Sequence, residues 1–158
     1  SLAPALNTTA RMLELCSLPN VAGLKFTDSN LFRLWELRRS GAVVFNGSDE
    51  MLAAGLLMGA NGGIGSIYNL LPAEFAGLYS NASAGRWEQA RQLQSAINEV
   101  IRVILQFPVF PAVKATLGFT GLDCGPCIAP RRGLTEEELA ELRRGLLATA
   151  AGARLLAS

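Results

Sequence analysis

Lys25 is the residue of this chain best suited to nucleophilic chemistry. The chain contains 14 basic residues, and only Lys25 and Lys114 among them are lysines. Lys25 lies in the apolar run Val21–Phe26, which predicts a buried strand. Burial disfavours an ammonium ion, and the neutral amine that it favours is a nucleophile toward carbonyl carbon. Lys25 is therefore a candidate Schiff-base lysine, although a lysine at a strand end can also snorkel to water or pair with a carboxylate.

Polar residues follow the apolar runs, where the strands are expected to end. Thr27 comes shortly after Lys25, the pair Asp49 and Glu50 follows the second run, and Ser66 lies in the third run. The carboxyl ends of parallel strands form one rim, where ligands bind. We expect a nucleophile, two carboxylates and hydroxyl groups to converge there. Asp49 and Glu50 could accept hydrogen bonds from a polyol, or merely cap a helix.

Three short apolar runs, separated by helical patterns, position these residues. The runs are Val21–Phe26, Ala42–Phe45 and Ile64–Tyr68. Helical spacing precedes the first run and fills both gaps, with Ser48 as the expected cap of the helix before the third run. This order predicts a parallel sheet with helices outside. The sequence of residues 1–70 thus predicts βα units.

Helical patterns alone occupy residues 71–158. Pro72 opens one helix, and a long amphipathic helix is expected over Trp87–Phe107. Pro111 should start a shorter helix, and Thr135 should cap the last one, with Glu138 completing a capping box. No low-complexity linker separates this part from residues 1–70, so we expect one continuous unit.

Composition excludes several classes of function. The chain has 158 residues, a net charge of +1 and no histidine, so it contains no Ser-His-Asp site and no His-ligated metal site. The scattered arginines do not suggest nucleic acid or a membrane surface as a partner. Cys124 and Cys127 have C-x-x-C spacing, but without a second ligand pair we interpret them as incidental thiols. An odd cysteine count without a signal peptide favours the cytoplasm, and no apolar run reaches the ~18 residues of a membrane span.

Three motifs together resemble the pyruvate-dependent class I aldolases, the family of N-acetylneuraminate lyase and dihydrodipicolinate synthase. They read Gly-Leu-Lys-Phe-Thr-Asp at 23–28, Phe-Asn-Gly-Ser-Asp-Glu at 45–50, and Gly-Gly-Ile-Gly-Ser-Ile-Tyr-Asn at 62–69. Each motif alone is weak, whereas their order and spacing are specific. The lyase branch fits best, because Phe26 follows the lysine where the synthase branch usually has glutamate. The resemblance implies part of a TIM (β/α)8 barrel, about three C-terminal βα units, followed by a C-terminal helical extension.

The resemblance also implies the roles of individual residues. Lys25 would form an imine with the keto carbon of pyruvate or sialic acid, and Thr27 would supply the hydroxyl beside it. Contact with sugar-derived hydroxyl groups would fall to Gly47, Asp49, Glu50 and Ser66. The reaction would be the reversible cleavage of N-acetylneuraminate to N-acetylmannosamine and pyruvate, with no metal and no cofactor beyond the covalent imine.

The resemblance is incomplete at one essential point. In the family, a proton-shuttling tyrosine lies on the strand before the lysine strand, and the hydroxyl pair that binds the pyruvate carboxylate lies earlier still. The tyrosines here are Tyr68 and Tyr79, and Tyr68 matches the third motif instead. We therefore expect the C-terminal half of a lyase, inactive alone. Its partners would be a keto acid and sugar substrate, and either further copies in a homo-oligomer (a tetramer by resemblance) or a separate N-terminal half.

Two alternatives remain open from the sequence. The first is another substrate on the same fold, as in a 2-keto-3-deoxy sugar acid aldolase or dihydrodipicolinate synthase. The second is a non-catalytic fragment that only packs or oligomerises, because an open half barrel leaves a strand edge near Val21–Phe26.

Overall fold

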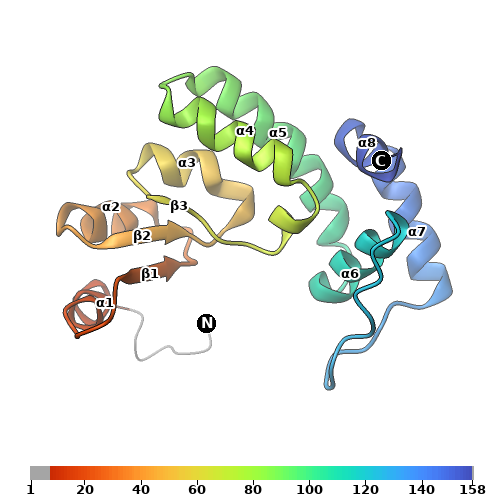
Figure 1. The fold of residues 1–158 in the computed structure, drawn as a ribbon, viewed down its shortest axis with the longest axis horizontal. Coiled ribbons are helices and arrows are strands. Elements are labelled where there is room, and N and C mark those ends of the chain that lie inside the picture. Colours follow the sequence, from red (N-terminus) through yellow and green to blue (C-terminus); the bar gives the residue numbers. More distant parts are fainter. Residues whose placement is uncertain (1–7, 158) are drawn as a thin grey trace.

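The computed structural model describes residues 8–157 and shows a small sheet flanked by helices, followed by a helical part (Figure 1). In the first part the elements are α1 (Thr9–Cys16), β1 (Gly23–Phe26), α2 (Leu31–Arg39), β2 (Val43–Asn46), a 3-10 turn (Asp49–Met51), α3 (Leu52–Leu57), β3 (Gly62–Gly63) and a second 3-10 turn (Ile67–Asn69). The second part comprises α4 (Pro72–Ser83), α5 (Trp87–Ile104), α6 (Val109–Phe119), α7 (Glu136–Leu147) and α8 (Ala150–Ala157).

The sheet is parallel, as predicted, with the strand order β1-β2-β3. In its register Lys25 lies beside Phe45, and Phe45 lies beside Gly62. Both α2 and α3 contact β2 and run along the same side of the sheet (Figure 1). Because partners in register point the same way, Phe26 and Asn46 share the face that these helices bury. The opposite face carries Lys25.

The predicted burial of Lys25 is wrong for this chain. Phe26, the next residue, is only 1% exposed, whereas Lys25 is exposed. The apolar run identified a strand but could not show how many of its faces are covered. Here β1 is an edge strand, and none of the elements within residues 8–157 packs over the face that carries Lys25.

The third strand differs from the prediction. Strand pairing is confined to Gly62–Gly63, just before the predicted run, and the expected strand Ile64–Tyr68 is instead a bend and a 3-10 turn. The amide of Ile64 still donates to the Asn46 carbonyl oxygen at 2.9 Å. Beyond it, the amide of Ile67 donates to a carboxylate at 2.8 Å, which draws the chain out of the sheet.

Helix boundaries also depart from the prediction, and the long helix predicted over Trp87–Phe107 ends at Ile104. Ser48 makes no capping hydrogen bond to a described residue, and the helix expected to follow it begins as a 3-10 turn. The helix expected from Pro111 begins at Val109, with Pro108 as its N-cap. The capping box of Thr135 and Glu138 is confirmed. The helix that it begins, α7, ends at Leu147, and α8 follows it, where a single last helix was predicted.

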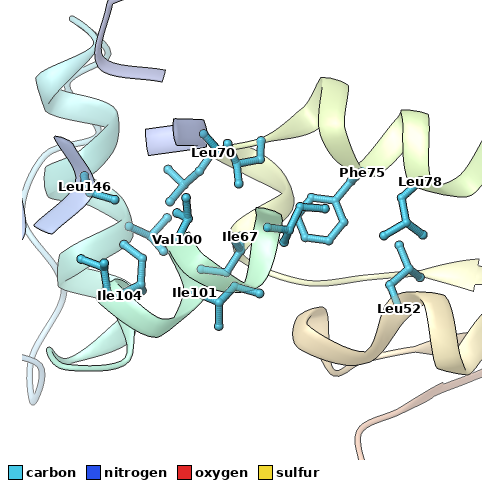
Figure 2. Packing of buried hydrophobic residues seen from close by; sticks show 14 of the residues in the cluster. Leu52, Ile67, Leu70, Phe75, Leu78, Val100, Ile101, Ile104 and Leu146 are labelled. Atoms are coloured by element: carbon cyan, nitrogen blue, oxygen red, sulfur yellow. The ribbon is translucent and has the colours of Figure 1, made fainter. Parts of the chain in front are cut away.

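The largest core lies in the helical part, and Figure 2 shows its packing. Leu142 and Leu146 of α7 and Ile97 and Ile104 of α5 are fully buried in it. Ile67 and Leu70 extend the same cluster to the chain that leaves β3. The helical part therefore packs directly against the end of the sheet where ligands would bind.

Two further features concern the second part of the chain. Within residues 8–157, no single helix is long and apolar enough to cross a membrane; α5 and α6 reach that length only as a pair bent by 108°. Cys124 and Cys127 lie in the loop between α6 and α7 as free thiols. Lys114 organises that loop by donating to the carbonyl oxygens of Cys124 at 2.9 Å, Gly125 at 3.3 Å and Pro126 at 2.9 Å.

Candidate functional site

A cavity of about 170 Å³ lies at the carboxyl end of the sheet. It is lined by Lys25, Gly47, Asp49, Glu50, Gly65, Ser66, Ile67, Ile101, Leu105 and Val109. All but three of these residues come from the ends of β1, β2 and β3, and those three belong to the α5–α6 region. The site is therefore built jointly by the strand ends and the helical part.

The absence of a side chain at Gly47 leaves room for Lys25 and Thr27 next to this cavity. A Cβ atom at Gly47 would lie 2.1 Å from the Thr27 hydroxyl oxygen and 2.8 Å from Lys25 Cε. Only glycine leaves room for both side chains over this stretch of backbone. Thr27 is not part of the cavity lining, but its hydroxyl thus lies beside Lys25 above Gly47.

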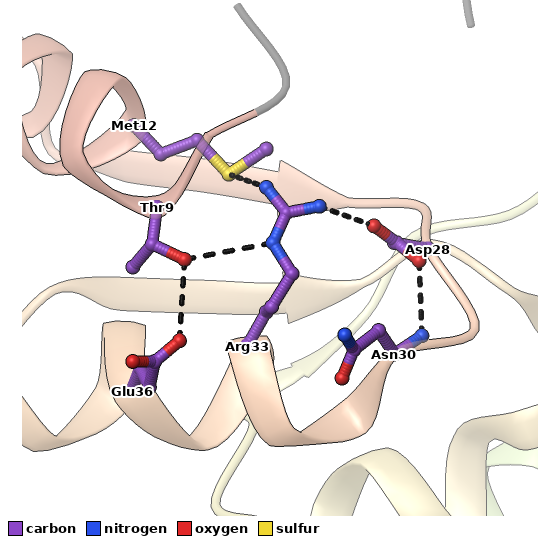
Figure 3. A network of polar contacts seen from close by, with 6 residues as sticks. All are labelled: Thr9, Met12, Asp28, Asn30, Arg33 and Glu36. Carbon is purple, nitrogen blue, oxygen red and sulfur yellow. Dashed lines mark hydrogen bonds and ion pairs between the residues drawn. The ribbon is translucent and has the colours of Figure 1, made fainter.

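A polar network fixes the loop that follows β1 (Figure 3). Asp28 accepts a hydrogen bond from the amide of Asn30 at 2.9 Å and pairs with Arg33 at 2.6 Å. Arg33 also donates to the hydroxyl of Thr9 at 3.5 Å, and that hydroxyl donates to Glu36 at 3.3 Å. The network ties α1, α2 and the end of β1 together, directly after Thr27.

Asp49 occupies the most constrained position in the site. Its side chain is 8% exposed, and its carboxylate accepts a hydrogen bond from the Ile67 amide. A Cβ atom at Gly65 would lie 1.4 Å from a carboxylate oxygen of Asp49, so that position requires glycine. Burial raises the pKa of the Asp49 carboxyl above its ordinary value of 3.8, and the charge of Glu50 adds to this. The Ile67 amide and the Lys25 ammonium act in the opposite direction.

Beside Asp49, Tyr68 places a buried hydroxyl group on the helix-covered side. Its ring stacks on Phe75 with centroids 3.9 Å apart, and a Cβ atom at Gly63 would lie 2.0 Å from its oxygen. Among the described residues this oxygen has no hydrogen-bond partner of ordinary geometry. Burial, reinforced by the charge of Asp49, raises the pKa of Tyr68 well above its ordinary range, and the nearby Asn46 amide opposes this only in part.

Amide side chains hold the backbone around Asp49 and Glu50. Asn46 Nδ2 donates to the Ser48 carbonyl oxygen at 2.6 Å. From α5, Gln94 Nε2 donates to the Asp49 carbonyl oxygen and Asn98 Nδ2 to the Glu50 carbonyl oxygen, each at 3.1 Å. The carboxylate of Asp49 and the exposed carboxylate of Glu50 therefore start from a backbone that is fixed on two sides.

The structure thus brings the sequence-predicted residues to one place. Five of them line the cavity, and Thr27 lies beside it. Sequence reasoning assigned no role to the surrounding amides or to the Tyr68 hydroxyl. A signal existed for Gln94, because it is a polar residue within the apolar stripe of α5. Within residues 8–157, no cluster of three or more histidine, cysteine, aspartate or glutamate side chains is arranged to hold a metal ion.

Comparison with known proteins agrees with this geometry. The sequence model of the dihydrodipicolinate synthetase family matches residues 5–149. The N-acetylneuraminate lyase of Rhizobium meliloti (strain 1021) is 44% identical over 141 residues, which cover 88% of this chain and 47% of that protein. The N-acetylneuraminate lyase of Escherichia coli O1:K1 is 35% identical over 147 residues, covering 89% of this chain and 50% of that protein.

A solved structure confirms the fold. The wild-type sialic acid aldolase of Ruminococcus gnavus superposes with a TM-score of 0.82 at 26% identity, covering 95% of this chain and 50% of that one. The predicted fold, part of a (β/α)8 barrel with a C-terminal helical extension, is therefore confirmed. The chain spans about half the length of the curated relatives that it matches.

Proposed function

The chain belongs to the dihydrodipicolinate synthetase family, and from this premise we propose that it supplies the imine-forming part of a pyruvate lyase that acts on N-acetylneuraminate. In this proposal Lys25 is the nucleophile and Thr27 the hydroxyl group beside it. The hydroxyl groups of the sugar contact Gly47, Asp49, Glu50 and Ser66. No other cofactor takes part, because the covalent imine provides the electron sink.

One observation carries the proposal: a primary amine and an acidic pair meet around a single cavity at the carboxyl end of a parallel sheet. In barrels of this type the active site lies at that end. The acidic pair favours a polyhydroxylated substrate, because carboxylates accept hydrogen bonds from several hydroxyl groups. The names of the relatives with 44% and 35% identity support the same substrate.

The proposed reaction begins when Lys25 Nζ adds to the C2 ketone carbon of open-chain N-acetylneuraminate and water leaves. The resulting protonated imine accepts the electron pair of the C3–C4 bond as a base, which we assign to no residue of this chain, takes the proton of the C4 hydroxyl group. This cleavage releases N-acetylmannosamine as an aldehyde and leaves an enamine on Lys25. Protonation at C3 and hydrolysis of the imine then release pyruvate and restore the amine.

Reductive trapping tests the nucleophile directly on this chain. We expect pyruvate and sodium borohydride to add one pyruvate-derived group at Lys25, located by peptide mass spectrometry. Lys25→Arg should abolish the adduct, whereas Lys114→Arg should keep it, because the Lys114 ammonium is held by loop carbonyl groups. Equal modification of both lysines, or of neither, would count against the proposal.

Substrate choice requires a second assay. The chain should bind N-acetylneuraminate more tightly than a shorter 2-keto-3-deoxy sugar acid that lacks the acetamido group, and Glu50→Gln should weaken the binding of N-acetylneuraminate about fivefold, since a hydrogen bond to a charged group is weakened. Titration calorimetry measures both affinities. Preference for the shorter acid would instead assign the chain to the 2-keto-3-deoxy sugar acid aldolases.

A further inference from the structure

Two linked amide groups on α5 bind consecutive backbone carbonyl groups of the acidic pair. Gln94 reaches the Asp49 carbonyl oxygen and Asn98 reaches the Glu50 carbonyl oxygen. Gln94 Nε2 also donates to Asn98 Oδ1 at 2.9 Å, so the two amides orient each other. In addition, Gln94 Oε1 accepts a hydrogen bond from the Ala53 amide at 2.9 Å. Gln94 therefore uses both ends of its amide on the segment that carries the carboxylates.

The backbone at Asp49–Met51 has few hydrogen bonds of its own, so the bonds from α5 matter for its stability. Asp49–Met51 is a single 3-10 turn, whose hydrogen-bond geometry is poorer than that of an α-helix. The Ala53 amide is one of the first amides of α3, which have no acceptor within that helix. Gln94, by contrast, is 8% exposed on a helix whose neighbouring residues Ala90 and Ile97 are fully buried. A buried side chain of a long helix thus holds a short turn that has few hydrogen bonds of its own.

We propose that Gln94 and Asn98 are positioning residues of the candidate site, which fix the backbone at residues 49 and 50 so that both carboxylates face a bound polyol. This inference rests on the proposed lyase function only for the identity of that polyol. The positioning itself is a property of the chain alone. Neither residue lines the cavity, so neither is assigned contact with the ligand.

Replacing Gln94 with methionine tests the inference, because methionine keeps the length of the side chain but makes no comparable hydrogen bond. Gln92→Met is the matched control, since Gln92 lies on the same helix and its side chain bonds, among residues 8–157, only to exposed Glu88. Carbon-detected NMR follows the titration of the Asp49 carboxyl, and calorimetry follows the binding of N-acetylmannosamine. In Gln94→Met the turn should move toward solvent, so the Asp49 pKa should fall toward its ordinary value and sugar affinity should drop about fivefold.

The outcomes separate the two proposals. A folded Gln94→Met chain whose Asp49 titration matches that of Gln92→Met would overturn the positioning role. If Gln94→Met does not fold, Asn98→Ser decides the same question through the Glu50 carbonyl contact: unchanged Asp49 and Glu50 amide resonances would overturn the role. Failure of the unsubstituted chain to bind the sugar or to trap pyruvate would refute the proposed function, while the Asp49 titration would still decide the positioning role.

Discussion

The two sides of the cavity are built in opposite ways. On one side, Asp49 is 8% exposed, bonded to Ile67 and supported from behind by α5. On the other side, Lys25 is exposed on an edge strand, and the network between α1 and α2 steadies the loop after it. Within residues 8–157, the carboxylate side is therefore supported from two directions, whereas the lysine side is exposed. A folded carboxylate side and a reactive lysine are separate requirements, and they respond to different substitutions.

Gly65→Ala should break the carboxylate side most severely. The new Cβ atom would clash with the Asp49 carboxylate, which can move only by giving up its bond to Ile67. We expect the free energy of unfolding to fall by about 3 kcal/mol. Urea denaturation measures it, with Gly118→Ala as the control. Gly118 has open space around it in α6, so that change should stabilise the chain by about 0.5 kcal/mol. Equal midpoints for the two variants would contradict this account of the packing.

Arg33→Met should loosen the lysine side by a smaller amount. Its ion pair with Asp28 is largely shielded, with 15% and 24% of the two side chains exposed. Removing the arginine leaves a partly buried carboxylate without this partner, and we expect a loss of about 2 kcal/mol in urea denaturation. Arg11→Met removes an ion pair whose side chains are 60% and 62% exposed, and should change stability by less than about 0.5 kcal/mol. If both variants lost a similar amount of unfolding free energy, the shielded ion pair of Arg33 would be no more stabilising than an exposed one.

Asp49 should make the stability of the chain depend on pH. Because its pKa is raised in the folded state, the folded chain binds more protons than the unfolded chain between the ordinary and the raised pKa. Stability from this group is therefore present at low pH and is lost as the pH rises through that window. Thermal unfolding between about pH 3 and pH 7 should show the stability of Asp49→Asn rising relative to the original chain.

Glu138 provides a control of the opposite sign. Its bonds to Arg132 and to the Thr135 amide lower its pKa to about 2. Its contribution is therefore present above the unfolded pKa and is lost as the pH falls toward about 2. Glu138→Gln should therefore remove a loss of stability that occurs as the pH falls. Asp49→Asn should remove a loss of stability that occurs as the pH rises. If the stability of both variants, relative to the original chain, changed with pH in the same direction, the raised pKa of Asp49 would be contradicted.

Lys25→Met should have the smallest effect on folding. The side chain is exposed and supports no core, so the free energy of unfolding should change by less than about 0.5 kcal/mol. The same substitution should abolish trapping by pyruvate and borohydride. A large loss of stability would show that Lys25 has a structural role that its exposure does not suggest.

Much of the sheet followed from local pattern, and the exceptions have physical causes. Ala42–Phe45 was predicted as a strand because it is short, apolar and followed by Asn-Gly, and the structure has a strand there, at Val43–Asn46. The run Ile64–Tyr68 has the same character but is not a strand. A carboxylate 18 residues earlier in the chain captures the Ile67 amide, and a local pattern cannot contain such a contact.

The site was predicted by residue type, whereas its supports were not. The three motifs placed Lys25, Asp49 and Ser66 at strand ends, where they line one cavity. Exposure of Lys25 depends on which faces of the sheet are covered, and the sequence of one strand does not contain that information. Gln94 could have been noticed, since a buried amide between Ala90 and Ile97 must find partners.

Through Gln94, helix α5 connects the 3-10 turn at Asp49–Met51 to the large core of the helical part. Gln94 lies one turn from Ile97, which is fully buried in the large core, so the amide contacts cannot separate far while that core remains closed. Amide hydrogen exchange at Ala53 should then proceed through the same opening as that of Ile97, with a similar protection factor, although Ala53 lies in the first turn of a six-residue helix that would otherwise fray. In that case the turn would open only when the helical core opens, and not by local fraying.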